Sequence, residues 1–184
     1  KNGGQTWNIS SEGIQKAEIY DAQFFSDSVY LVTTPTGLWR TTNKGLDWNR
    51  ILERNTACNT VNFEKTSTGG LVANKNKKLY YSPNAVDGFI DISEPHFISG
   101  LKFFINPSND HLFLNGTQGF LRSFNLGQSW ESTPYVQIEE MVFHPDGRMI
   151  GIEQDNKYLL LSDNEGLTWD TVTMPAPPEG GKAD

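Results

Sequence analysis

The chain has a single cysteine, Cys58, among its 184 residues. One thiol can neither form an intrachain disulfide nor supply the ligands of a cysteine-based zinc site. The three histidines, His96, His111 and His144, lie far apart, and none has a second histidine at the spacing of a metal-binding pair. We therefore expect neither a metal nor another cofactor.

Basic residues are also scarce. The chain has 15 Lys and Arg against 22 Asp and Glu, which gives a net charge of −7, and its only short basic run is Lys75, Lys77 and Lys78. Proteins that bind a nucleic-acid backbone cluster lysine and arginine, so we expect no nucleic-acid partner. No apolar run approaches the length of about 18 residues that indicates a transmembrane helix. We therefore expect no membrane span.

Helical periodicity of convincing length is missing as well. Short apolar runs typical of strands recur instead, within five copies of one pattern about 40 residues apart. Each copy has an asparagine followed by a glycine and then an aromatic residue, except that the third copy has Val86 in the glycine position. The residues of the five copies are Asn2, Gly4 and Trp7; Asn43, Gly45 and Trp48; Asn84 and Phe89; Asn125, Gly127 and Trp130; and Asn164, Gly166 and Trp169.

The pattern predicts a hairpin turn that leads into a strand. An asparagine side chain can accept hydrogen bonds from backbone N–H groups further along the turn, and glycine adopts the positive φ that tight turns require. In the last four copies a serine or threonine lies two positions before the asparagine, as Thr41 does before Asn43. We expect these residues to have a structural role.

Each repeat contains four runs with strand character, and four antiparallel strands at this period are typical of propeller blades. The predicted fold is therefore an all-β propeller with four complete blades, at residues 11–50, 51–91, 92–132 and 133–173. Residues 1–10 form one extra N-terminal strand, and residues 174–184 are a Pro/Gly-rich tail or linker. Because the extra strand is left over, we expect either a part of a larger propeller, with six or more blades, or an open half-propeller that pairs with another copy. A closed ring of four blades is a third arrangement, but it does not explain the extra strand.

The segments "TTNKGLDW", "SFNLGQSW" and "SDNEGLTW" resemble Asp-box (BNR) repeats, with asparagine where aspartate is usual. Over a longer stretch, "INPSNDHLFLNGTQGFLRSFNLGQSW" resembles the repeats of xyloglucanase-type glycoside hydrolases, Vps10/sortilin ectodomains and photosystem II assembly factor propellers. The resemblance implies a propeller whose box is structural and an extracellular or periplasmic location. It assigns no activity, because the same box occurs in enzymes, receptors and assembly factors.

Two catalytic interpretations can be weighed from the residues. A sialidase needs three arginines that converge on the substrate carboxylate, whereas Arg40 and Arg122 occupy one repeat position, which favours a role on the strand surface. A xyloglucanase-type enzyme needs two carboxylates about 5 to 10 Å apart, and nothing in the sequence pairs any two of the candidates. These candidates are Asp21, Asp27, Glu64, Asp110, Glu139, Glu140 and Asp155.

Aromatic residues near one repeat position could stack on sugars or form the core between blades, and the core is favoured. They are Trp39, Tyr80, Tyr81 and Phe120. We therefore expect no catalytic residue. The predicted function is a non-catalytic binding or scaffold module that recognises a protein or a glycan through its inter-blade loops. The alternative is a fragment of a secreted glycoside hydrolase.

Overall fold

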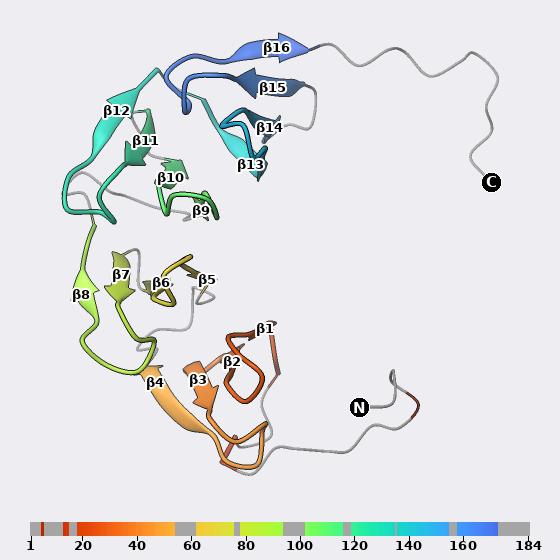
Figure 1. Ribbon diagram of the computed structural model, residues 1–184, viewed down its shortest axis with the longest axis vertical. Coiled ribbons are helices and arrows are strands. Elements are labelled where there is room, and N and C mark those ends of the chain that lie inside the picture. Colours follow the sequence, from red (N-terminus) through yellow and green to blue (C-terminus); the bar gives the residue numbers. More distant parts are fainter. Residues whose placement is uncertain are drawn as a thin grey trace. The chain divides into compact units, whose positions relative to one another are not determined.

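A computed structural model of the chain describes residues 5, 13–14, 18–53, 62–75, 78–93, 102–115, 119–134, 136–154 and 158–172. Within these ranges the chain forms sixteen β-strands and no helix (Figure 1). The strands make four sheets, each with four antiparallel strands in sequence order. The prediction of an all-β propeller fold with about four blades is confirmed. The predicted extra strand at residues 1–10 and the tail at 174–184 lie almost entirely outside the described residues.

The chain divides into two compact units, residues 1–95 and 96–184, and each unit contains two sheets. Sheet 1 consists of β1 (Asp21–Phe24), β2 (Tyr30–Thr34), β3 (Gly37–Thr41) and β4 (Asn49–Glu53). Sheet 2 consists of β5 (Phe63–Lys65), β6 (Leu71–Lys75), β7 (Lys78–Ser82) and β8 (Ile90–Asp91). These two sheets form the first unit.

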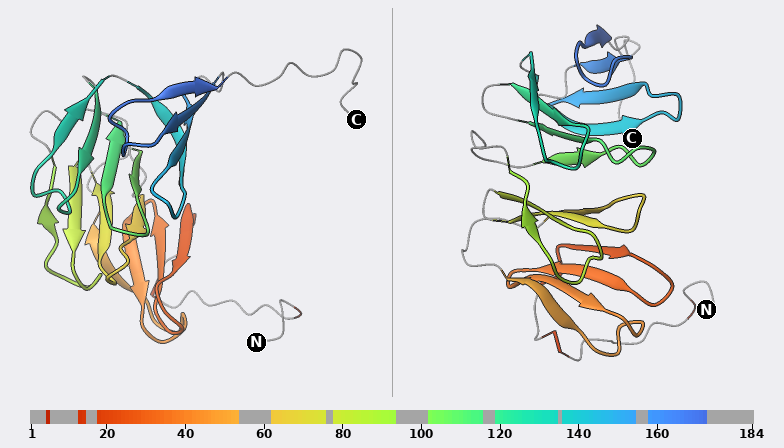
Figure 2. Two further views of the ribbon diagram at one scale, coloured as in Figure 1. Left: turned by 45° about the horizontal axis from the view of Figure 1, so that its top comes forward. Right: turned by 60° about the vertical axis from the view of Figure 1, so that its left-hand side comes forward.

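The second unit has the same organisation. Sheet 3 consists of β9 (Phe103–Ile105), β10 (Leu112–Asn115), β11 (Phe120–Ser123) and β12 (Glu131–Thr133). Sheet 4 consists of β13 (Ile138–Phe143), β14 (Met149–Glu153), β15 (Leu159–Ser162) and β16 (Asp170–Val172). Figure 2 shows the antiparallel strands of the individual sheets from two further sides.

A hydrophobic core lies between the two sheets of each unit. In the first unit, Leu31 and Leu38 of sheet 1 pack with Phe63 and Leu71 of sheet 2. In the second unit, the core is formed by Phe104, Phe113 and Phe120 of sheet 3 with Ile138, Met141, Met149 and Leu160 of sheet 4. The middle strands β2, β6 and β10 are almost wholly buried. Burial of such apolar side chains is the main stabilising contribution to each pair of sheets.

Candidate functional site

The turns predicted from the repeat are closed by their own side chains. The Thr41 hydroxyl donates to Asn43 Oδ1 at 2.9 Å and accepts from the Gly45 N–H at 3.0 Å. Asn43 Oδ1 also accepts from the Asp47 N–H at 2.9 Å. The turns at Asn125 and Asn164 repeat this arrangement with Ser123 and Ser162 in place of the threonine. The Ser, Thr and Asn side-chain oxygens of these three turns thus make hydrogen bonds within the turns themselves.

Two successive residues in each of these turns have positive φ. Lys44 and Gly45 have φ values of 63° and 90°, and Glu165 and Gly166 have values of 55° and 78°. In the turn at Asn84, Ala85 has a φ of 56° and the glycine with positive φ is Gly88, which compensates for Val86. The displaced glycine was not recognised in the sequence. The first copy, with Asn2, Gly4 and Trp7, lies outside the described residues.

The aromatic residue of each described copy is half-buried and packs toward a core. Phe89 packs against the core of the first unit. The Trp169 ring meets Phe120 edge-on, with ring centroids 5.7 Å apart. Trp48 and Trp130 are also half-buried.

Of the four aromatics considered for sugar stacking, Phe120 is fully buried and belongs to the core of the second unit. Trp39 is half-buried and donates from Nε1 to the Thr34 and Thr36 hydroxyls, each at 3.1 Å. Tyr80 and Tyr81 are half-buried on β7. None of the four is fully exposed, which favours the core interpretation.

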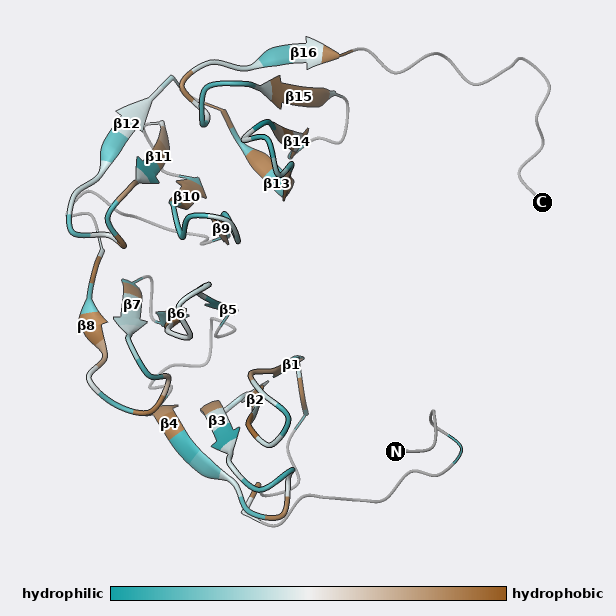
Figure 3. Ribbon diagram, in the orientation of Figure 1, coloured by the Kyte–Doolittle hydropathy of each residue, from teal (hydrophilic) through white to brown (hydrophobic). Residues whose placement is uncertain are grey.

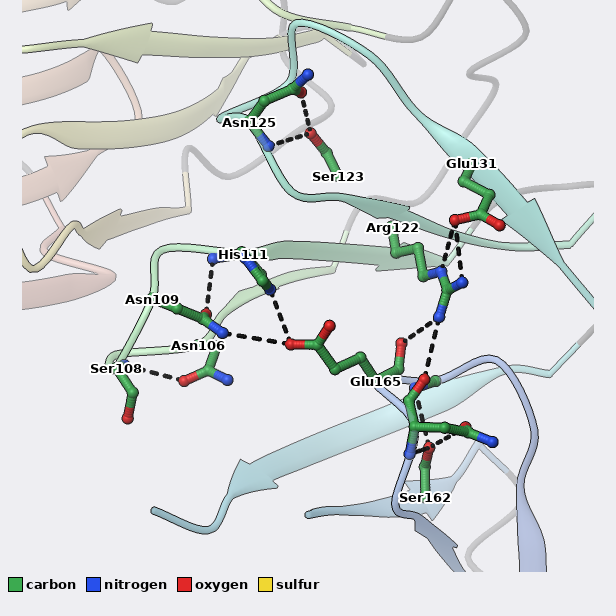
Figure 4. A network of polar contacts seen from close by, with 12 residues as sticks. Asn106, Ser108, Asn109, His111, Arg122, Ser123, Asn125, Glu131, Ser162 and Glu165 are labelled. Atoms are coloured by element: carbon green, nitrogen blue, oxygen red, sulfur yellow. Dashed lines mark hydrogen bonds and ion pairs between the residues drawn. The ribbon is translucent and has the colours of Figure 1, made fainter. Parts of the chain in front are cut away.

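A polar network joins sheet 3 to the Asn164 turn of sheet 4 (Figure 4). The buried Arg122 guanidinium donates to Glu131 Oε2 at 3.0 Å and to the carbonyl oxygens of Asn164 and Glu165, each at 3.1 Å. The Glu165 carboxylate faces His111 Nδ1 at 2.8 Å and accepts from Asn109 Nδ2 at 3.3 Å. Arg122 is therefore a structural link between two sheets, and it does not lie on an open strand surface.

The structure places most of the candidate catalytic carboxylates in structural contacts. Asp110 is buried in a turn, where it has a φ of 60° and donates its N–H to the Asn106 carbonyl. Glu139 and Glu140 both face Lys102. Asp27 lies in the hairpin between β1 and β2, and Asp155 lies outside the described residues.

Glu64, on β5, differs from the others because the pKa of its carboxyl is raised, although the residue as a whole is exposed. The main cause is partial burial of the carboxyl group, and the charge of Asp21 on β1 adds to it. A hydrogen bond with the Gln23 side chain acts in the opposite direction. Asp21 and Glu64 are also brought together, from the first strands of sheets 1 and 2.

The face of sheet 4 that does not pack on sheet 3 is aliphatic. In register across the sheet, Val142 pairs with Ile150 and Ile150 with Leu161, while Ile152 pairs with Leu159 and Leu159 with Val172. Val142 is 60% exposed, Leu161 40% and Ile150 39%. We call these six residues the outer face of sheet 4. Strand β15 accordingly has hydrophobic colour along most of its length in Figure 3.

An antiparallel sheet with one face in water normally alternates apolar and polar residues, so apolar residues on both faces indicate that both are covered. A pocket of about 300 Å³ opens on this face. Ile150 and Leu161 line the pocket, as does Met149, which is adjacent to Ile150 in the sequence. Asp163 and Asp170 contribute carboxylates to its lining. Sequence reasoning missed this site. The unbroken run of Tyr158 to Leu161 was the available signal.

Charged residues at one end of the pocket are tied to one another. Asp146 accepts from Arg148 Nε at 2.9 Å and from Nη2 at 2.8 Å, and its other oxygen lies 2.6 Å from His144 Nδ1. The Arg148 guanidinium holds the pKa of the Asp146 carboxyl well below its usual range. Arg148 and His144 both line the pocket.

No family model matches the sequence, and no curated protein matches it. Solved structures do match. YCF48 bound to a D1 peptide is 16% identical with a TM-score of 0.67, over 93% of this chain and 60% of that chain. The GH74 xyloglucanase of Xanthomonas campestris is 14% identical with a TM-score of 0.59, over 80% of this chain and 23% of the enzyme.

A third match is the extracellular domain of a one-component system from B. thetaiotaomicron, which is 12% identical with a TM-score of 0.64, over 93% of this chain and 24% of that one. The predicted resemblance to assembly-factor and xyloglucanase propellers is confirmed at the level of the fold. This chain spans less than two thirds of each of these three proteins.

Two further features concern the described residues as a whole. No group of three or more His, Cys, Asp or Glu residues in those ranges is placed to hold a metal ion. The same ranges contain no helix that is long and apolar enough to cross a membrane.

Proposed function

We propose that this chain is a non-catalytic propeller module that binds a protein segment on the outer face of sheet 4. The observation that carries the proposal is the exposed aliphatic surface of that sheet with its pocket of about 300 Å³. Exposed apolar surface of this kind is costly in water, and contiguous patches mark interaction sites. The fold has a precedent for this role, since YCF48, which shares it, has been solved with a bound peptide.

The chemistry of the pocket specifies the kind of segment. Ile150 and Leu161 suit an aliphatic side chain, and the carboxylates of Asp163 and Asp170 suit a cationic neighbour. The Arg148 guanidinium is already engaged by Asp146, so it is less available to an acidic ligand. An alternation of aliphatic and basic residues in an extended segment matches these features.

Fluorescence polarisation with two labelled peptides tests this function. We expect a peptide of alternating leucine and lysine to bind, and a peptide of alternating leucine and glutamate to bind at least about tenfold more weakly. Ile150→Glu should remove binding, whereas Leu46→Glu, at an exposed leucine in the Asn43 turn, should leave it unchanged. Equal binding by both peptides, or no effect of Ile150→Glu, would contradict the proposal.

We also propose an extracellular or periplasmic location. The support is the match to a protein described as an extracellular domain. Immunoblotting of cell fractions from the native source tests it, and a purely cytoplasmic signal would refute it.

Glycoside hydrolysis is the second candidate function, favoured by the raised pKa of Glu64 beside Asp21. A carboxyl that stays protonated up to a higher pH than usual can act as a general acid, with a second carboxylate as its partner. Release of reducing ends from xyloglucan, lost in both Glu64→Gln and Asp21→Asn, would support this function. A wild-type chain that releases none would eliminate it for this substrate.

A further inference from the structure

The outer face of sheet 4 is equivalent to a face of sheet 3 that is buried inside the second unit. Arg122 and Leu161 each lie three residues before a turn asparagine, and their partners in register are Phe113 and Ile150. Phe113 is fully buried against sheet 4. Ile150 therefore occupies the position of a residue that a following sheet covers.

Sheet 1 follows the same rule in the first unit. Leu31 pairs in register with Arg40, three residues before Asn43, and Leu31 is fully buried against sheet 2. In both units the same face of the earlier sheet is thus covered by the later sheet. The surface that fits the outer face of sheet 4 is the opposite face of another sheet with this repeat.

The chain itself carries such a surface on sheet 1. Phe143 and Phe24 are equivalent, because each pairs in register with the first residue of the next strand, Met149 and Tyr30 respectively. Phe143 packs on Phe113 of sheet 3, with ring centroids 5.5 Å apart. Phe24 is 76% exposed, and its described ring contact is an edge-on one with Tyr30 of the adjacent strand.

Beside Phe24 the surface is hollowed. A pocket of about 420 Å³ is lined by Phe24, Phe25 and Tyr30 with the hairpin residues between them. Exposed aromatic residues next to a pocket are typical of the anchors in protein interfaces. Sheet 1 thus presents Phe24 at the position where sheet 4 presents Phe143 to sheet 3.

We propose that the outer face of sheet 4 binds sheet 1 of a second copy of this chain. The contact repeats the one between sheets 3 and 4, so Phe24 of one copy packs on Ile150 of the other, as Phe143 packs on Phe113. At the position of the buried Arg122 the interface has Leu161, which avoids the cost of burying a charge. The proposal rests on the proposed function because it uses the same surface, but its partner is a folded sheet with aromatic side chains and not an extended aliphatic and basic segment.

The two copies meet through different surfaces, which makes the contact heterologous. A heterologous contact has a property that an isologous one lacks. A variant damaged only in sheet 4 retains a normal sheet 1, and a variant damaged only in sheet 1 retains a normal sheet 4. The two variants can therefore form the contact with each other although neither forms it alone.

Sedimentation velocity over a range of concentrations tests the proposal. We expect the wild-type chain to reach at least twice its mass of 20.7 kDa, and Ile150→Glu and Phe24→Glu each to remain monomeric. An equimolar mixture of the two variants should form a heterodimer. Leu46→Glu, an exposed control outside both surfaces, should associate as the wild type does, and circular dichroism should show that all variants are folded.

A monomeric wild-type chain would overturn the proposal, as would two folded variants whose mixture stays monomeric. Peptide binding measured on the monomer separates this failure from that of the proposed function. If the chain is monomeric but binds the leucine–lysine peptide through Ile150, the surface is real and its partner is another protein. If it neither associates nor binds the peptide, both proposals fail.

Discussion

Arg122 of β11 donates from Nη1 to the main-chain carbonyl of Glu165, at 3.1 Å, in the turn between β15 and β16. The two residues belong to different sheets, and the guanidinium also bonds to Glu131 of its own sheet. Charge-assisted hydrogen bonds of a buried group contribute more than neutral ones on the surface. This contact therefore holds the turn of one sheet against the strands of the previous one.

Replacing Arg122 by methionine should lower the free energy of unfolding by about 2 to 3 kcal/mol, since hydrogen bonds to two carbonyls and one carboxylate are lost. Urea denaturation measures the change. Arg148→Met is the matched control, because Arg148 also pairs with a carboxylate but is 64% exposed, and such surface pairs contribute little. Equal losses in the two variants would show that Arg122 is an ordinary surface residue.

Gly166 is restricted by its backbone and by its neighbour at the same time. Its φ is 78°, and a Cβ at this position would lie 2.9 Å from the Phe120 ring. Gly147 has a φ of 94° with nothing within 4 Å of the same point. Gly147→Ala should cost about 1 to 2 kcal/mol, from the left-handed conformation alone. Gly166→Ala should cost at least about 1 kcal/mol more, because it also displaces Phe120.

Thermal and urea denaturation of the two glycine variants provide the comparison. Near-ultraviolet circular dichroism offers a second readout, since Phe120 and Trp169 pack edge-on beside the turn and only Gly166→Ala should change their signal. An equal loss of stability with unchanged spectra would mean that the ring moves aside without cost.

The turns could be predicted from the sequence because their hydrogen bonds are local. Thr41, Asn43 and Gly45 satisfy one another within a few residues, so residue spacing contains nearly all of the information. The four strands of each sheet follow for the same reason, since few residues separate each strand from the next. The residues that were missed depend on distant contacts.

Arg122 illustrates what could not be predicted from the sequence. Its carbonyl partners are 42 and 43 residues further along the chain, and from the sequence alone it could not be distinguished from an arginine that covers a strand surface. The pairing of Asp21 with Glu64 likewise depends on how sheet 1 packs on sheet 2. The outer face of sheet 4 was visible only as a strand with too many apolar residues for a solvated sheet.

Glu64 gives a prediction for pH dependence. Its pKa is raised in the folded chain, mainly by partial burial of the carboxyl, so the folded state favours the protonated form. The stability that Glu64 contributes is therefore fully present below the pKa of an unfolded glutamate and is lost as the pH rises through the folded-state pKa. At neutral pH the ionised carboxylate opposes folding.

Glu64→Gln should consequently raise the melting temperature at pH 7 and leave it unchanged near pH 3.5. Glu18→Gln, at an exposed glutamate ahead of β1, should show no such difference between the two pH values. Differential scanning calorimetry at several pH values measures the effect. A Glu64→Gln variant that is less stable at pH 7 would show that the Gln23 contact outweighs the cost of burial.

Two asparagines of the repeat, Asn125 and Asn43, should differ in how much stability they lose when replaced by aspartate. Asn125 Nδ2 donates to the Ser129 hydroxyl at 2.8 Å, whereas Asn43 Nδ2 donates to the Asp47 carboxylate at 2.8 Å. In Asn125→Asp the serine hydroxyl can rotate and become the donor. In Asn43→Asp two carboxylates would face each other at hydrogen-bond distance, where like charges repel.

We therefore expect Asn125→Asp to be nearly neutral and Asn43→Asp to lose about 1 kcal/mol of stability at pH 7. The loss should shrink below about pH 4, where a carboxylate takes up a proton. The double variant Asn43→Asp with Asp47→Ser reproduces the aspartate–serine pairing of Asn125→Asp and should recover most of the stability. If the double variant is no more stable than Asn43→Asp alone, the penalty does not arise from the facing carboxylates, and the asparagine amide itself is required at this turn.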